Sequence, residues 1–228
     1  DTATTEIYTL SLYDALPISG IMAAGTWLQL PDTDGQLYWY YFNESGKKSA
    51  DKWQKIGGGN YHFDDEGRME TGWILDDMYY CDENDGMKTG WAWLADPADN
   101  DYLSPSSAED YHWYYFLASG KKYVPDEDSS GYGERRVDGV KYCFDENGRM
   151  QTGWVDFGGE GLGIADYKYY NDNGSVRTGW YSLVPPERLE NSYERSVEWF
   201  YFQNDGTPRS ASDGILTEGD IVRINGKQ

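Results

Sequence analysis

The residue types that carry most enzyme chemistry are scarce or poorly spaced in this chain. Its two histidines, His62 and His112, both lie inside aromatic stretches. The sequence holds no nucleophile elbow, no phosphate-cradling glycine loop and no histidine pair at metal-binding spacing. Aspartate and glutamate are plentiful, at 40 residues against 19 lysines and arginines, but an acidic surface explains their number. We therefore expect no catalytic residues, no metal site and no cofactor.

Two acidic stretches, DENDG at residues 82–86 and PADND at 97–101, raise the question of a calcium site. Neither fits the EF-hand loop, which ends in a glutamate, so we interpret both as ordinary turns. The two cysteines, Cys81 and Cys143, each replace an aromatic residue in a strand-like stretch. Two cysteines are too few for a metal site, and we expect buried free thiols rather than a disulfide.

The formal net charge of −21 disfavours nucleic acid and anionic membrane surfaces as partners and favours cationic or uncharged ligands. The sequence has no run of eighteen apolar residues, so we expect no membrane insertion. Aromatic residues make up 17% of the chain and glycines number 27. Aromatic stretches broken by Gly, Asn and Asp are typical of short strands and tight turns.

One phrase recurs along the chain: GRMETGW at residues 67–73 returns as GRMQTGW at 148–154. It belongs to a longer unit, complete from Trp53 to Trp73, in which a tryptophan precedes a polar run, an aromatic stretch and an acidic turn ending in glycine. Such repetition indicates a repeat architecture. The aromatic stretches lie at residues 39–42, 61–63, 79–81, 113–116, 142–144, 169–170 and 199–202, and the turn glycines that follow them are Gly46, Gly67, Gly86, Gly120, Gly148, Gly174 and Gly206.

Each unit predicts a β-hairpin, because aromatic residues suit a half-buried pleated surface and glycine supplies the positive φ that such turns need. A single hairpin is barely stable in water, whereas stacked hairpins bury their aromatic residues against one another, as in solenoids. The fold class that we predict is therefore all-β.

The pattern WYYF-x-x-x-G-x-M-x-T-G-W resembles the cell-wall-binding repeats of bacterial surface proteins, above all choline-binding modules, to which glucan-binding and clostridial-toxin repeats are related. The resemblance covers about residues 25–228. It implies a solenoid of stacked β-hairpins, about seven repeats plus a partial eighth, with roughly three hairpins per turn. It also implies that choline sits between successive hairpins in a cage of aromatic side chains, held by cation–π attraction.

The resemblance further implies which residues form a cage: the tryptophan that opens a repeat, the tryptophan of its aromatic stretch and an aromatic residue of the next repeat. Three repeats carry both tryptophans, and elsewhere the second position holds Asn60, Met78, Lys141 or Lys168. The third wall is Tyr61 or His62 after the first pair and Tyr142 or Cys143 after the second, since strand alternation puts one of each on the ligand side. The candidate ligand-binding residues are Trp27, Trp39, Tyr61, Trp91, Trp113, Tyr142, Trp180 and Trp199.

The three repeats with tryptophan pairs also carry long insertions, at residues 28–38, 92–112 and 181–198. They are the first, fourth and seventh, so three hairpins per turn would place them on one side. We predict that the pairs and insertions form a single recognition stripe. The alternative is that these tryptophans pack beneath the inserted loops.

We expect a non-catalytic binding module, residues 20–228, that anchors a secreted bacterial protein to the cell surface through choline-bearing teichoic acid or another cell-wall glycan. One alternative is an adhesin- or toxin-like stalk whose inserted loops bind a host glycan or protein, and another is a pure spacer. Residues 1–19 lack the repeat chemistry and the pattern of a signal peptide, and we predict a non-native or disordered segment there. The final INGKQ resembles an eighth unit cut short.

Overall fold

The computed structural model describes residues 17–18, 21–97, 111–126, 131–158, 163–186 and 197–210. The N-terminal segment up to residue 16, the final INGKQ, residues 98–110 of the second insertion and residues 187–196 of the third lie outside these ranges. The chain forms two compact units. The first holds Asp1–Ala92, Pro97–Asp101 and Phe116–Lys122, and the second holds Trp93–Asp96, Tyr102–Tyr115 and Tyr123–Gln228.

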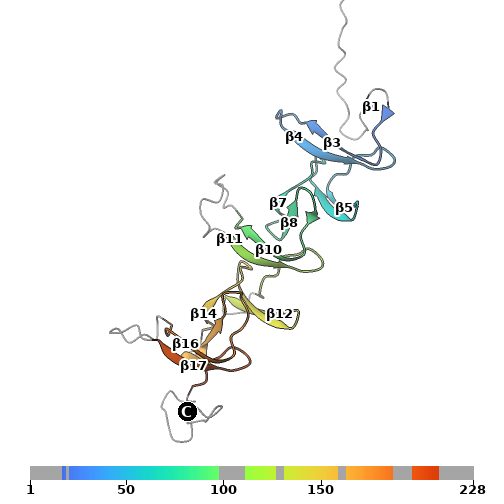
Figure 1. Cartoon of the computed structure of the whole chain (residues 1–228). Helices are drawn as coiled ribbons and strands as arrows, with labels where there is room; N and C mark the ends of the chain where they lie inside the picture. The colour runs from blue at the N-terminus through green and yellow to red at the C-terminus, as the bar shows by residue number, and fades with distance from the viewer. Residues whose placement is uncertain are drawn as a thin grey trace, which may run out of the picture. The chain divides into compact units, whose positions relative to one another are not determined.

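The secondary structure consists of strands, most of them in antiparallel hairpins, as the sequence predicts (Figure 1). No α-helix occurs in the described ranges, which contain one short 3-10 turn, η2 (Ile164–Asp166), and no helix there is long and apolar enough to cross a membrane. The paired strands up to residue 95 are β1 (Pro17–Ile18) with β2 (Ile21–Met22), β3 (Thr26–Pro31) with β4 (Leu37–Phe42), β5 (Lys52–Ile56) with β6 (Gly59–Phe63), and β7 (Gly72–Ile74) with β8 (Tyr79–Asp82) and β9 (Gly86–Met87). Further along are β10 (Gly90–Ala95) with β11 (Tyr111–Phe116), β12 (Tyr132–Val137) with β13 (Val140–Asp145), β14 (Gly153–Asp156) with β15 (Tyr167–Tyr170), and β16 (Gly179–Leu183) with β17 (Glu198–Phe202).

Two kinds of turn recur in the described part of the chain. The hairpin loops of β5–β6 and β12–β13 are two-residue turns, Gly57-Gly58 and Asp138-Gly139, in which both residues have positive φ, as a turn that matches the strand twist requires. The acidic turns lie after the second strand of the hairpin. Their glycines also have positive φ, and the N–H of Gly67 donates to the Asp64 carbonyl at 3.0 Å, so the predicted role of these glycines is confirmed.

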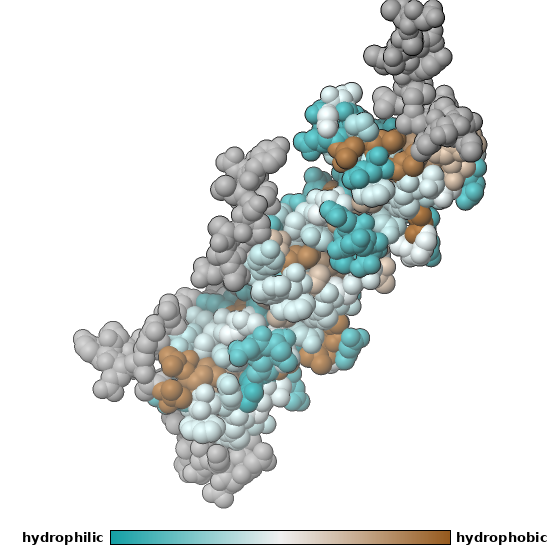
Figure 2. All heavy atoms as spheres, turned by 45° about the horizontal axis from the view of Figure 1, so that its top comes forward, coloured by the Kyte–Doolittle hydropathy of each residue, from teal (hydrophilic) through white to brown (hydrophobic). Residues whose placement is uncertain are grey.

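The core is a series of aromatic residues that end the aromatic stretches. Each is at most 2% exposed and bridges back to a residue just beyond the acidic turn. The bridged pairs are Phe42 with Lys48, Phe63 with Met69, Phe116 with Lys122, Phe144 with Met150, Tyr170 with Val176 and Phe202 with Pro208. On the face drawn in Figure 2, strongly hydrophobic residues form small separate patches among more polar ones.

The two cysteines follow the same packing. Cys81 takes the place of the core aromatic in its hairpin, paired with Met87, and is 2% exposed. Cys143 is fully buried beside Val155 and Tyr170. Both are free thiols, as predicted. Burial raises the pKa of Cys81 to about 11 and that of Cys143 to about 12.

Successive hairpins are joined by a recurring backbone hydrogen bond. In the first unit, the N–H of Met69 donates to the Trp39 carbonyl at 2.8 Å, and that of Lys122 donates to Met78 at 2.7 Å. In the second unit, the same bond links Met150 to Trp113 at 2.8 Å and Val176 to Lys141 at 2.9 Å. In these four cases, the residue beyond the turn therefore fixes the backbone of the preceding hairpin at the position that Trp39 and Trp113 occupy.

Candidate functional site

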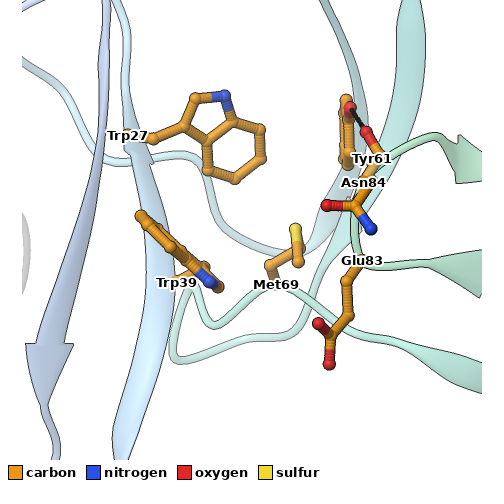
Figure 3. Close-up of a pocket in the computed structure, with 6 residues that line it drawn as sticks. All are labelled: Trp27, Trp39, Tyr61, Met69, Glu83 and Asn84. Carbon is orange, nitrogen blue, oxygen red and sulfur yellow. Dashed lines mark hydrogen bonds between the residues drawn. The ribbon is translucent and has the colours of Figure 1, made fainter.

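The first unit contains an aromatic pocket of about 270 Å³ (Figure 3). Three successive hairpins build it. Trp27 and Trp39 come from β3 and β4, Tyr61 comes from β6, and Met69 follows the next acidic turn. Glu83 and Asn84 complete the lining from the turn between β8 and β9.

Strand register places both tryptophans on one face of the first hairpin. Trp27 pairs with Tyr41 and Trp39 pairs with Gln29, so the two indoles are diagonal neighbours, within reach of each other across the strands. Trp27 is held by packing: its ring lies 5.0 Å from that of Tyr61 in an edge-to-face arrangement. Trp39 is 42% exposed, so its ring is open to a ligand.

The structure separates the residues that the sequence left as alternatives. Tyr61 lines the pocket, and its hydroxyl donates to the Asn84 carbonyl at 2.8 Å. His62 is 8% exposed, pairs through Nδ1 with the Glu70 carboxylate and packs against the Trp53 ring at 4.9 Å. It therefore points away from the pocket.

Three pocket residues were not found from the sequence. Met69 had a signal, because methionine recurs at this position of the repeated phrase. Glu83 and Asn84 had no such signal, because they belong to the DENDG stretch, which the sequence led us to interpret as an ordinary turn. That stretch forms a turn in which Asp82 Oδ1 accepts the Asn84 N–H at 2.9 Å and the Asp85 N–H at 3.3 Å. The hydrogen bond from the Asn84 N–H, followed by that from Asp85, holds the pKa of Asp82 below its usual value.

The second tryptophan pair is divided between the units, with Trp91 in the first and Trp113 in the second, and its predicted cage stays a prediction. Trp113 is 42% exposed. Its ring lies 5.5 Å from that of Trp93, which is 50% exposed and itself stacks on Tyr111 at 6.3 Å. Trp93 was not singled out from the sequence, although the WAW spacing at 91–93 puts two indoles on one strand face.

For the second tryptophan pair the structure describes both candidates for the third wall, and for the third pair it describes the two tryptophans themselves. Tyr142 is partly exposed while its neighbour Cys143 is fully buried, which favours Tyr142 on the ligand side. Trp180 pairs with Tyr201 across the strands, and their rings lie 5.4 Å apart. Trp199 pairs with Ser182 and is 63% exposed. Residues beyond 210 lie outside the described ranges.

The assignment of Lys168 to the second tryptophan position is wrong. In β14–β15, Trp154 pairs with Tyr169 and Asp156 with Tyr167. Comparison with the register of β3–β4 makes Tyr167 the counterpart of Trp39. The sequence YKYY is compatible with either register, and only the pairing decides between them.

Trp154 lies among four aromatic rings. Their centroids are 5.2 to 6.2 Å from that of Trp154 and belong to Tyr167, Tyr169, Phe200 and Phe202. Tyr167 is only 6% exposed, so this aromatic cluster is packed on itself.

Lys141 and Lys168 converge on one carboxylate. Their ammonium groups lie 3.1 and 2.8 Å from Glu134, which also accepts the Tyr170 hydroxyl at 2.6 Å. Burial alone would raise the pKa of Glu134, but hydrogen bonds from Lys168, Tyr170 and Lys141 outweigh burial and lower it. These lysines serve an internal ion cluster.

A second group of carboxylates, Asp64, Asp65 and Glu66, has oxygens within 4.8 Å of one another in the acidic turn after β6. Arg68 pairs with Asp64 and Glu66, each at 2.7 Å. The guanidinium therefore neutralises part of the negative charge of the cluster. An ordinary acidic turn on a protein surface accounts for these three carboxylates.

Residues 50–91 match the model of the choline-binding repeat family. This segment includes Tyr61, Met69, Glu83 and Asn84 of the pocket, and the match confirms the resemblance drawn from the sequence. No curated protein sequence matches the chain.

Three solved structures illustrate what the chain is similar to. They are CbpJ from Streptococcus pneumoniae TIGR4 (21% identity, TM-score 0.47), the modular autolysin LytC from the same species in complex with a synthetic peptidoglycan ligand (23%, 0.34) and choline binding protein F from that species (21%, 0.30). The matches cover 83%, 77% and 82% of this chain and 66%, 44% and 80% of theirs. The chain thus spans just under two thirds of CbpJ and less than half of LytC.

Proposed function

We propose that this chain is a non-catalytic binding module that holds a secreted bacterial protein at the cell surface through aromatic cages for choline or a wall glycan. The pocket of Trp27, Trp39 and Tyr61 is the observation that carries the proposal. It joins two indoles and a phenol from successive hairpins, the arrangement that cation–π recognition of a quaternary ammonium uses. Residues 20–228 would form the binding domain.

The affinity expected for a single cage is weak, which suits a polymer that several cages can bind at once. A ring contributes roughly 0.5–2 kcal/mol to binding a cation, so three rings give about millimolar affinity. Several cages on one chain would raise the avidity for a polymer that carries many choline groups. Teichoic acid with its choline substituents is such a polymer, and the net charge of −21 favours its cationic groups.

The arrangement of cages would follow from the stacking of hairpins. The backbone bond that recurs from hairpin to hairpin, as between Met69 and Trp39, supports a solenoid of about seven repeats and a partial eighth with roughly three hairpins per turn. The three tryptophan pairs would then lie on one recognition stripe. Trp39, Trp113 and Trp199 are each at least 42% exposed, which is what such a stripe requires.

The test is a calorimetric titration of the whole chain with choline, from millimolar concentrations upward. Trp39→Ala should remove the part of the heat that belongs to this pocket. Trp93→Ala is the comparison variant, because Trp93 is as exposed as Trp39 but lies beside Trp113 and does not line the pocket. Absence of heat in the parent would rule out choline, and the full parental heat in Trp39→Ala would rule out this pocket as a site.

An adhesin- or toxin-like stalk that binds a host glycan or protein is the second candidate. Trp93 belongs to the inserted segment 92–112 and Trp113 directly follows it, and the exposed rings of both favour this candidate. It predicts no choline heat, and retention on immobilised glycans or host proteins that Trp93→Ala weakens while Trp39→Ala does not.

A further inference from the structure

We infer that Glu83 makes the pocket of Trp27, Trp39 and Tyr61 selective for a cation over a neutral ligand of the same shape. The inference rests on the proposed function, because it concerns what that pocket binds. It goes beyond the aromatic cage by assigning a specificity-determining role to a carboxylate from a third hairpin.

The position of Glu83 follows from a variant acidic turn. In the turn after β6, the glycine, Gly67, stands four residues after the core residue Phe63. In the turn after β8, the glycine, Gly86, stands five residues after Cys81, which is one residue later. Gly86 has φ of 71° and lies so close to β6 that a Cβ atom there would come within 2.3 Å of the Asn60 carbonyl oxygen. Only glycine allows this approach, which brings the turn with Glu83 to the edge of the pocket.

A hydrogen bond ties this turn to the cage wall. The Tyr61 hydroxyl donates to the Asn84 carbonyl at 2.8 Å, the dashed line in Figure 3. The residue next to Glu83 is therefore anchored to one of the rings that would contact the ligand. Glu83 itself lines the same pocket.

The carboxylates around Glu83 are engaged elsewhere. Lys88 Nζ lies 3.6 Å from both Asp82 and Asp85, and Asp82 accepts two backbone N–H groups. Within the described part of the chain, Glu83 takes part in no ion pair. Its negative charge can therefore attract a cation that enters the pocket.

A quaternary ammonium cannot donate a hydrogen bond, so it senses a carboxylate through charge alone. Two unit charges about 4 Å apart attract by about 1 kcal/mol in water and more near a protein surface, where 1.4 kcal/mol corresponds to a factor of ten in affinity. A neutral isostere gains nothing from Glu83. The attraction also weakens as salt shortens the Debye length, from about 10 Å at 0.1 M to 3 Å at 1 M.

The test compares choline with 3,3-dimethylbutan-1-ol, which replaces the ammonium nitrogen by carbon. Met69 lines the pocket, and its methyl NMR signal, one of five methionine signals, reports on this site alone. Titrations run at constant ionic strength on the whole chain, with Met69→Leu used to assign the signal. Glu83→Gln should weaken choline binding about fivefold and leave the alcohol unchanged, and the choline difference should shrink at 1 M NaCl.

Glu146→Gln is the matched control, since Glu146 stands in the corresponding DENG turn of another hairpin, is exposed and does not line the pocket. It removes the same net charge and should change neither affinity. Unchanged choline affinity in Glu83→Gln, or equal weakening of both ligands, would overturn the inference while leaving the cage in place. Failure of Trp39→Ala to alter the Met69 titration would instead overturn the proposed function itself.

Discussion

The hairpins β3–β4 and β14–β15 carry aromatic residues at the same strand positions but use them differently. Trp27 and Trp154 correspond by register, as do Trp39 and Tyr167. Trp39 is 42% exposed and lines a pocket, whereas Tyr167 is 6% exposed and packs against Trp154. One hairpin scaffold thus produces either an open aromatic pocket or a closed aromatic core.

Internal cations extend this comparison. The buried Lys122 places its ammonium 4.9 Å from the Trp73 ring centroid, and Lys168 places its own 4.7 Å from Phe157. These ring faces are occupied by the chain's own ammonium groups, which satisfy the same cation–π attraction. The Trp39 pocket is instead lined by Glu83, and we propose that a cation from outside binds there.

The largest expected effect is a difference in stability between a variant of the aromatic core and a variant of the pocket. Trp154→Ala should lower the free energy of unfolding by about 3 kcal/mol, because it removes a large ring from a packed cluster. Trp39→Ala should cost less than about 1 kcal/mol, because its ring is open to solvent. Chemical denaturation measures both, and equal losses would mean that Trp39 is also a core residue.

Thiol labelling adds a local readout to the same prediction. Cys143 packs beside Val155 in the second unit, while Cys81 lies in the first. Trp154→Ala should speed the labelling of Cys143 and leave that of Cys81 unchanged, since both thiols are buried with raised pKa values and react only on opening. Equal acceleration at both cysteines would show that the loss is not local.

A smaller effect on stability is expected at the ion cluster of Glu134, Lys141 and Lys168. Glu134→Gln should lower the free energy of unfolding by about 2 kcal/mol at pH 7, because Lys141 and Lys168 lose their shared carboxylate. The folded-state pKa of Glu134 lies below its ordinary value of 4.5. Its stabilisation is therefore fully present above about pH 4.5 and is lost as the pH falls through the folded-state pKa.

Denaturation of the parent and Glu134→Gln at a series of pH values checks this sign. The gap in unfolding free energy should be widest near neutral pH and should narrow below pH 4.5. A gap that widens as the pH falls would contradict the assignment, and the exposed Glu146→Gln supplies the baseline.

The smallest effect sharpens the pocket itself. Tyr61→Phe keeps the ring but removes the bond to the Asn84 carbonyl, so choline affinity should fall only about twofold and stability by at most about 1 kcal/mol. Tyr41→Phe is the control, since the Tyr41 hydroxyl makes no hydrogen bond to the described residues. A tenfold loss in Tyr61→Phe alone would mean that the hydroxyl contacts the ligand.

Local features of this fold could be predicted from sequence. Positive φ at Gly67 and its counterparts, hairpins around the aromatic stretches and burial of Cys81 all follow from short-range patterns. The register of Tyr167 could not be predicted, because YKYY alternates equally well in two frames.

The pocket was partly predictable for a similar reason. The resemblance to choline-binding repeats implies Trp27 and Trp39, with Tyr61 or His62 as the third wall. Glu83 depends on a third hairpin and on a glycine shifted by one residue to Gly86, a tertiary arrangement that no local pattern encodes.

A crystal structure of the chain grown with choline tests the central claim most directly. The account predicts a trimethylammonium group between Trp27, Trp39 and Tyr61, with Glu83 beside it and the Trp154 cluster unchanged. Choline bound at other aromatic residues, with this pocket empty at saturating concentration, would contradict it.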